Sequence, residues 1–192
     1  SSVAESMIVN NYADHIYTLS KGVSWITFQN ECVAVRIDDQ LCKQGKGITL
    51  YSAFKQNLKG DKIYTVFEDS EGDEWILTNK GISIVGKKQV DSDFPFQYIK
   101  EADGIIYLVS QSDKLASYNF KSRQFKFIEI PYHVSMINEV KKFDSNTLLL
   151  ATDNGLIIYK IKEKKFQLID IRTSTQPSSV VQSVYQDHYK EL

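Results

Sequence analysis

The chain has 192 residues, a formal net charge of −1 and no apolar run near the roughly 18 to 20 residues of a membrane-spanning helix. The balanced charge gives no electrostatic reason to expect nucleic-acid or anionic-membrane binding. The hydrophobic content of 42% argues against intrinsic disorder. Val, Ile and Thr supply 43 residues, whereas the stronger helix formers Ala and Leu supply 20. Because β-branched side chains favour strands, the composition excludes a helical bundle and predicts an all-β fold.

The start of the chain shows no positively charged segment followed by an apolar one, and Ser1 stands where an initiator Met would be. We therefore expect a cytosolic protein, or a trimmed one whose targeting signal is missing.

The first predicted strands lie within Tyr12–Ile37, and two cysteines, Cys32 and Cys42, flank an Asp38–Asp39 turn. Two interpretations stay open: buried or half-buried thiols on neighbouring strands, or a cross-strand disulfide, which needs Cα atoms within about 7 Å. A metal site is disfavoured because no second Cys/His pair follows at ligand spacing. The histidines are scattered, at His15, His133 and His188.

The clearest pattern covers Ile63–Val85 and predicts three short strands. These are Ile63–Glu68, Trp75–Thr78 and Ile82–Val85, separated by an acidic turn that contains Gly72 and by a tight turn in which Gly81 is expected to supply a positive φ. Further along, Gln124–Ile130 and Lys165–Ile171 alternate apolar and polar residues, as strands with one solvated face do. The segment 162–165 before the second of them is predicted as a solvated hairpin tip.

The three-strand pattern recurs along the chain. Sliding it over the sequence aligns Trp25, Trp75, Tyr107 and Leu149, and projects a fifth anchor to position 193, with spacings of 50, 32, 42 and 44. A period near 42 with about four short strands is typical of β-propeller blades. We therefore predict a partial, open propeller over residues 1–192. Its blades are expected at about 8–50, 51–95, 96–132 and 133–176, with the start of a further blade at 177–192.

The recurring residues resemble the two-component-regulator propeller repeat. The match is strong from Val66 to Asp69, at Trp75–Thr78 and at Gly81, good at Leu149–Tyr159 and Val181–Asp187, and weaker at Trp25. It is weakest at Tyr107, where Ser110 and Asp113 replace Thr and Gly. The resemblance implies a periplasmic sensor fragment of a Bacteroides-type hybrid two-component histidine kinase that responds to a glycan. Kinase activity and phosphorelay would then belong to the parent protein, and this segment would be no enzyme.

No residue is predicted to be catalytic, to ligate a metal or to hold a cofactor, and the ligand-binding residues are unknown. The chain has no Gly-x-Ser-x-Gly, phosphate-loop or His-Glu-x-x-His motif. The acidic segment Asp69–Glu74 departs from a calcium loop, because Glu71 and Glu74 stand where Asp or Asn and Gly are required. Trp25 and Trp75 could stack on sugars, but their recurrence favours core packing. His133 is expected to be a surface residue.

The predicted partners are an oligosaccharide and the remaining blades of the parent chain or another copy of it, with no nucleic acid and no direct membrane insertion. We expect the blades to form an open arc, with their terminal faces or the unpaired Val181–Asp187 strand covered by another chain. The alternatives are a propeller enzyme acting on carbohydrate, such as a lyase or glycosidase, and a protein-interaction scaffold. A pocket with convergent polar groups favours the enzyme, and an exposed apolar patch favours the scaffold.

Overall fold

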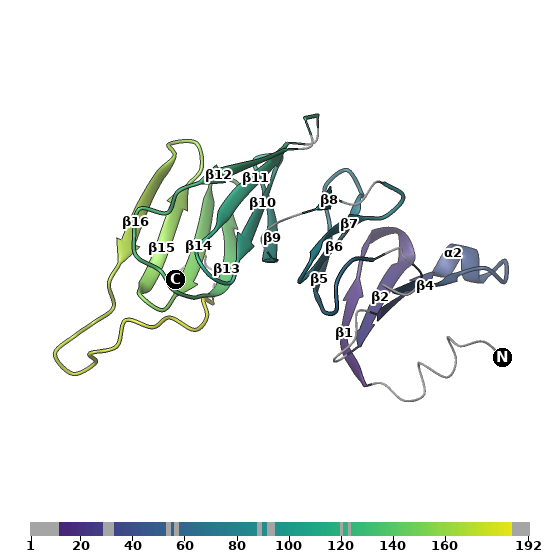
Figure 1. Ribbon diagram of the computed structural model, residues 1–192, viewed down its shortest axis with the longest axis horizontal. Coiled ribbons are helices and arrows are strands. Elements are labelled where there is room, and N and C mark those ends of the chain that lie inside the picture. The colour runs from purple at the N-terminus through teal and green to yellow at the C-terminus, as the bar shows by residue number, and fades with distance from the viewer. Residues whose placement is uncertain are drawn as a thin grey trace. The chain divides into compact units, whose positions relative to one another are not determined.

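The computed structural model describes residues 12–28, 33–52, 55, 58–87, 90–91, 95–119, 121–122 and 124–185. The chain divides into two compact units, Ser1–Pro95 and Phe96–Leu192, and each contains two antiparallel four-stranded sheets. Figure 1 shows these sheets, coloured from purple in the first to yellow-green in the last.

In unit 1, the strands of each sheet follow one another in chain order. The first sheet consists of β1 (Ala13–Thr18), β2 (Val23–Phe28), β3 (Val33–Asp38) and β4 (Ile48–Ser52), with a short 3-10 turn η1 (Ser20–Gly22) and helix α2 (Asp39–Cys42) in its connections. The second consists of β5 (Ile63–Glu68), β6 (Glu74–Thr78), β7 (Gly81–Ile84) and β8 (Val90–Asp91).

Unit 2 repeats this meander twice. The third sheet consists of β9 (Phe96–Ala102), β10 (Ile105–Ser110), β11 (Leu115–Asn119) and β12 (Gln124–Ile128). The fourth consists of β13 (Ile137–Asp144), β14 (Thr147–Thr152), β15 (Gly155–Lys160) and β16 (Lys165–Ile169). Four unclosed four-stranded meanders confirm the prediction of an all-β fold made of propeller blades.

The strand register shows that the sequence repeat is a structural repeat. The first residues of β5 and β13, Ile63 and Ile137, pair with Thr78 and Thr152 on the second strands of their sheets, and a β-bulge follows each. Ala13 and Phe96 make the same pairing in the other two sheets, again next to a bulge. In every sheet the predicted anchor residue lies three positions before that pair; the anchors are Trp25, Trp75, Tyr107 and Leu149.

The recurring threonine organises the hairpin between the second and third strands. The hydroxyl of Thr152 donates to the Gly155 carbonyl oxygen at 2.7 Å and accepts from the Asn154 N–H at 3.1 Å, and Thr78 makes the matching pair of bonds to Gly81 and Lys80. At Gly155, where φ is +104°, an added Cβ would lie 2.5 Å from the Ile169 carbonyl oxygen, which explains the glycine. Gly81 has the positive φ that was predicted, but at 158° it is close to extended backbone.

The residue after this threonine hydrogen-bonds the loop that precedes the first strand of the same sheet. The Asn79 side-chain oxygen accepts from the backbone N–H groups of Asp61 and Lys62, at 2.9 and 3.1 Å. The Asp153 carboxylate does the same for Ser135 and Met136, at 3.1 and 3.2 Å. The Thr-(Asn/Asp)-x-Gly motif thus stabilises two turns at once.

We expect Thr152→Val to lower the free energy of unfolding by about 1–2 kcal/mol, because the fully buried hydroxyl makes two hydrogen bonds that valine cannot replace. Urea titration followed by circular dichroism measures this. Thr49→Val is the matched control, since Thr49 is exposed on β4, and should change stability by less than about 0.5 kcal/mol. Equal losses for the two variants would contradict the assigned role.

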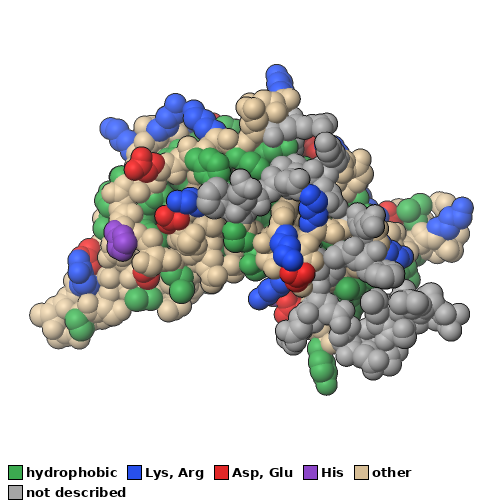
Figure 2. Space-filling view, in the orientation of Figure 1, with side chains coloured by type: hydrophobic (Ala, Val, Ile, Leu, Met, Phe, Trp, Pro, Cys, Tyr) green, Lys and Arg blue, Asp and Glu red, His purple; other side chains and the backbone are tan. Residues whose placement is uncertain are grey.

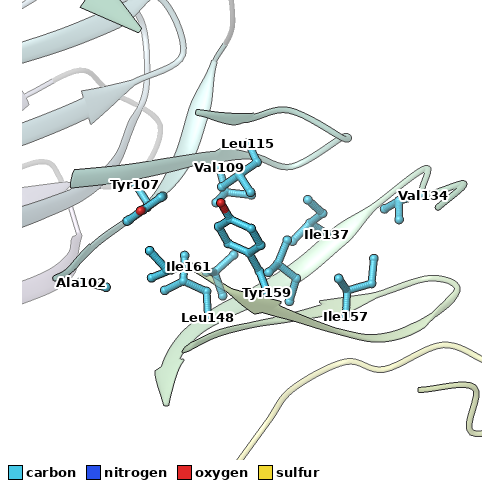
Figure 3. Packing of buried hydrophobic residues seen from close by; sticks show 12 residues of the cluster. Ala102, Tyr107, Val109, Leu115, Val134, Ile137, Leu148, Ile157, Tyr159 and Ile161 are labelled. Carbon is cyan, nitrogen blue, oxygen red and sulfur yellow. The ribbon is translucent and has the colours of Figure 1, made fainter. Parts of the chain in front are cut away.

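Each unit has a core between its two sheets. In unit 2 the residues shown in Figure 3 lie on both sheets, with Tyr107 and Leu115 from the third and Leu148 and Tyr159 from the fourth. The ring centroids of Tyr107 and Tyr159 lie 6.3 Å apart, and burial raises the pKa of the Tyr107 phenol to about 12. The inter-sheet core therefore comes from alternate residues of neighbouring strands, as stacked blades require.

The β3–β4 connection differs from its prediction. The Asp38 side chain accepts from the Gln40 and Leu41 N–H groups, both at 3.1 Å, so the backbone forms α2 instead of a two-residue turn. Cys42 consequently lies on α2, exposed and with a free thiol, so the prediction that it lies on a strand is wrong.

Cys32 lies outside the described residues, as does the end of the predicted Val181–Asp187 strand. Residues 181–185 are described and belong to no β-ladder.

Candidate functional site

The acidic turn between β5 and β6 is organised by Asp69. One carboxylate oxygen accepts from the N–H groups of Glu71 and Asp73, at 3.0 and 2.8 Å, and the other accepts from the Trp75 indole N–H at 2.8 Å. Both oxygens of this buried carboxylate are therefore used within the protein, which agrees with a structural turn. Within the described residues, no group of three or more His, Cys, Asp or Glu side chains is placed to hold a metal ion.

Both tryptophans are core residues, as their recurrence predicted, with 0% of Trp25 and of Trp75 exposed. Trp25 packs in the core cluster between the two sheets of unit 1, next to residues such as Ile63 and Ile76. Its ring centroid is 4.8 Å from that of Tyr51, and its indole N–H donates to Glu74 at 2.6 Å.

Glu74 is the centre of a polar cluster between the two sheets of unit 1. Arg36, on β3, donates from Nε and Nη2 to the Glu74 carboxylate on β6, at 2.9 and 2.8 Å, and its Nη1 reaches Asp38 at 3.3 Å. The Arg36 and Glu74 side chains are only 17% and 12% exposed. Hydrogen bonding to Glu74 raises the pKa of the Arg36 guanidinium. The cluster ties the two sheets together with a charged pair in a partly desolvated place.

A second polar region follows the first strands of the sheets in unit 2, β9 and β13. The Tyr98 hydroxyl donates to the carbonyl oxygens of Ile137 and Asn138, at 3.0 and 2.9 Å. The Asn138 side chain then donates to the Val181 carbonyl oxygen at 2.8 Å. The Tyr98 bonds therefore connect β9 to β13, and the Asn138 bond connects β13 to the segment that follows Ser178.

The segment 179–185 reaches the fourth sheet through backbone and side-chain hydrogen bonds. Its Val181 N–H donates to the Thr152 carbonyl oxygen at 2.8 Å. The Val184 N–H donates to the Glu139 carboxylate at 2.6 Å. Residues 181–184 thus contact the fourth sheet without joining its β-ladder, and their covering by another chain stays a prediction.

The face of the first sheet opposite its core with the second sheet is apolar. Its paired positions form a row across all four strands, Ile16–Ile26–Val35–Leu50, on the side opposite the core with the second sheet. At one end of that row Ile16 is 66% exposed. The face is apolar, as expected, but Val35 in the same row is only 5% exposed, and the covering of this face by another chain also stays a prediction.

The remaining residues singled out from the sequence lie at the surface. His133 is exposed, and its carbonyl oxygen accepts from the Asn154 side chain at 3.0 Å. Residues 161–164 form the turn between β15 and β16, as predicted for a hairpin tip. His188 lies outside the described residues. On the face shown in Figure 2, both basic and acidic side chains are exposed.

Sequence reasoning did not find the partners in either polar cluster. Arg36 and Glu74 are 38 positions apart in the chain, and nothing local links them. The alternation along the first strands of unit 2 was the available signal for side chains that share a face. It places Tyr98 and Lys100 on one face of β9, and Glu139 and Lys141 on the equivalent face of β13.

No family model matches the chain, and no curated protein matches it. Among solved structures, the extracellular domain of the putative one component system BT4673 from B. thetaiotaomicron is 17% identical over 93% of this chain, with a TM-score of 0.69. That of the putative hybrid two component system BT3049 from the same organism is 19% identical over 93%, with a TM-score of 0.68. Virginiamycin B lyase from Staphylococcus aureus is 18% identical over 84%, with a TM-score of 0.65.

These likenesses define the fold: the chain consists of propeller blades like those in the extracellular domains of two-component systems. It spans 25% and 24% of the length of the two B. thetaiotaomicron domains and 56% of the lyase. Within the described residues, no helix is both long and apolar enough to cross a membrane.

Proposed function

We propose that this chain is part of the periplasmic sensor region of a hybrid two-component histidine kinase and that its ligand is an oligosaccharide. The observation that carries the proposal is the likeness of 93% of the chain to the extracellular domains of BT4673 and BT3049. The repeat motif supports it independently, because Thr78 and Thr152 bond the matching turns of the second and fourth sheets, and Asp69 bonds the buried Trp75 in the second.

Rigid blades suit a transmission role. Their turns are fixed by side-chain hydrogen bonds and their faces by buried aromatic residues, so ligand energy would be used to shift one rigid part against another and not to order a loop. Binding then biases a two-state equilibrium of the parent protein, to the extent that the ligand has different affinities for the two states.

The experiment is a thermal-shift and calorimetric screen of the purified chain against neutral and acidic oligosaccharides of two to ten sugars. At a concentration of about 100 times Kd, a ligand should raise Tm by roughly 5–10 °C. Sucrose at equal mass concentration controls for non-specific stabilisation by excluded solutes. Saturable binding of one saccharide class is expected, and no saturable binding of any oligosaccharide would contradict the proposal.

The likeness to virginiamycin B lyase favours an enzyme as the second candidate. The same samples are therefore incubated with polysaccharides and with virginiamycin B, and product formation is followed by mass spectrometry. Turnover that a single carboxylate or histidine substitution abolishes would replace the sensor proposal with an enzymatic one. Binding without turnover would support the sensor.

A further inference from the structure

Three connections of unit 2 meet beside the turn between β14 and β15. The Asp153 N–H donates to the Met136 carbonyl oxygen, and the Asn154 side chain donates to that of His133, both at 3.0 Å. From the connection that follows β16, the Ser179 hydroxyl donates to the Asp153 carbonyl oxygen at 3.3 Å. These bonds join the three connections into one surface, which we call the loop surface and which comprises residues 131–136, 153–154 and 170–181.

The connection after β16 forms an exposed arm of the loop surface. Figure 1 shows it in yellow, extending away from the fourth sheet. The backbone N–H groups of Thr173 and Gln176 each donate to the other residue's carbonyl oxygen, at 2.8 and 3.2 Å, so the arm contains a closed turn. Residues 172–178 are all exposed. The arm is therefore accessible beside the β14–β15 turn, and connections of this kind often carry binding residues.

Two large apolar side chains of the loop surface are exposed. Met136 is 47% exposed, and Val180 is 40% exposed. Both lie next to the β14–β15 turn, because Met136 bonds Asp153 and the residue after Val180 bonds the Thr152 carbonyl oxygen, at 2.8 Å. Apolar groups are thus presented beside a turn that carries amide and carboxylate groups, and this mixture suits a ligand that is partly apolar and partly polar.

The charged groups of the loop surface are bonded within the protein. The Asp153 carboxylate accepts from the N–H groups of Ser135 and Met136, at 3.1 and 3.2 Å. Asp170 is paired with Arg172, whose Nε donates to the two carboxylate oxygens at 3.0 and 2.9 Å. The loop surface has no Lys or Glu, and its other polar side chains, His133 apart, carry hydroxyl or amide groups. A neutral ligand can therefore bind here without leaving a charge desolvated and unpaired.

We propose that the loop surface binds a neutral oligosaccharide, with Met136 and Val180 in contact with the C–H faces of the sugar rings and the Ser135 hydroxyl bonded to a sugar hydroxyl. The inference rests on the proposed function and narrows its ligand to the neutral class. A sugar hydroxyl both donates and accepts, as hydroxyl and amide side chains do, whereas a carboxylate only accepts. An acidic sugar would bring a charge to a surface whose guanidinium, that of Arg172, is already bonded to Asp170.

The test is calorimetric titration of the intact chain with neutral hexasaccharides of glucose, mannose, galactose, xylose and arabinose, and with hexagalacturonate. At least one neutral hexasaccharide should bind saturably and more tightly than hexagalacturonate. Met136→Ala and Val180→Ala should each raise the Kd of that neutral ligand by about threefold to tenfold, since each removes apolar area that the ligand covers.

The matched control is Ile105→Ala. Ile105 is 38% exposed at the start of β10, whereas the loop surface adjoins the other end of that strand, where the Ile137 N–H donates to the Gln111 carbonyl oxygen at 2.6 Å. This variant should leave Kd within about twofold. Met136→Leu keeps a large apolar side chain and should also retain Kd within about twofold, which separates a lost ligand contact from a lost fold.

Unchanged affinity for the neutral ligand in both alanine variants, or an equal loss in Ile105→Ala, would overturn the assignment. If the chain binds hexagalacturonate alone, the inference about the loop surface is wrong and the sensor function stands. If it binds no oligosaccharide, the proposed function fails as well.

Discussion

Replacing Trp75 by alanine is expected to lower the free energy of unfolding by about 3–5 kcal/mol, the usual cost of removing a fully buried large aromatic side chain. Trp75 is 0% exposed, and its indole N–H donates to the Asp69 carboxylate that organises the β5–β6 turn. The loss therefore combines a cavity with a buried acceptor that has lost one donor. Chemical denaturation followed by circular dichroism measures it.

Trp75→Phe is the control that separates these terms. It keeps a six-membered aromatic ring and removes the indole donor with a small part of the ring volume, so it should cost clearly less than alanine, about 1–2 kcal/mol. The same reasoning applies to Trp25→Ala, since Trp25 is equally buried and donates to Glu74. A tryptophan variant that keeps its Tm while losing oligosaccharide binding would show that the residue contacts ligand and does not serve packing.

The second large effect is expected for Glu74→Ala, which should destabilise the chain by about 2–4 kcal/mol. The value lies between that of an exposed ion pair and that of a buried one, because the Arg36 and Glu74 side chains are 17% and 12% exposed. Removing the carboxylate takes the acceptor from both the Arg36 fork and the Trp25 indole. Among the described residues, Arg36 then keeps its longer contact with Asp38, at 3.3 Å.

A double-mutant cycle with Arg36→Met isolates the ion pair, because removing both partners leaves no unpaired charge in place. We expect the double variant to be more stable than the sum of the two single losses predicts. Glu71→Ala, at an exposed position of the same turn, should change stability by less than about 0.5 kcal/mol. Additive losses in the cycle would show that Arg36 and Glu74 do not act as a pair.

The blades could be predicted because their determinants are local. Alternation of apolar and polar residues specifies a strand, and β5 is observed at the predicted Ile63–Glu68. The recurrence of Trp25, Trp75, Tyr107 and Leu149 located the second strand of every sheet, since each anchor must fill the same place in a repeated packing arrangement. Composition alone excluded the helical classes.

The partners of the polar side chains were decided only by the tertiary structure. Glu74 on β6 meets Arg36 on β3 because the packing of one sheet on the next brings together residues that lie 38 positions apart in the chain. No local sequence pattern predicts this contact, because it depends on which face of each strand packs against the neighbouring sheet and on the conformation of the loops between them. The short helix α2 was missed for a related reason: Asp38 can start either a turn or a helix, and its side chain caps the N–H groups of Gln40 and Leu41.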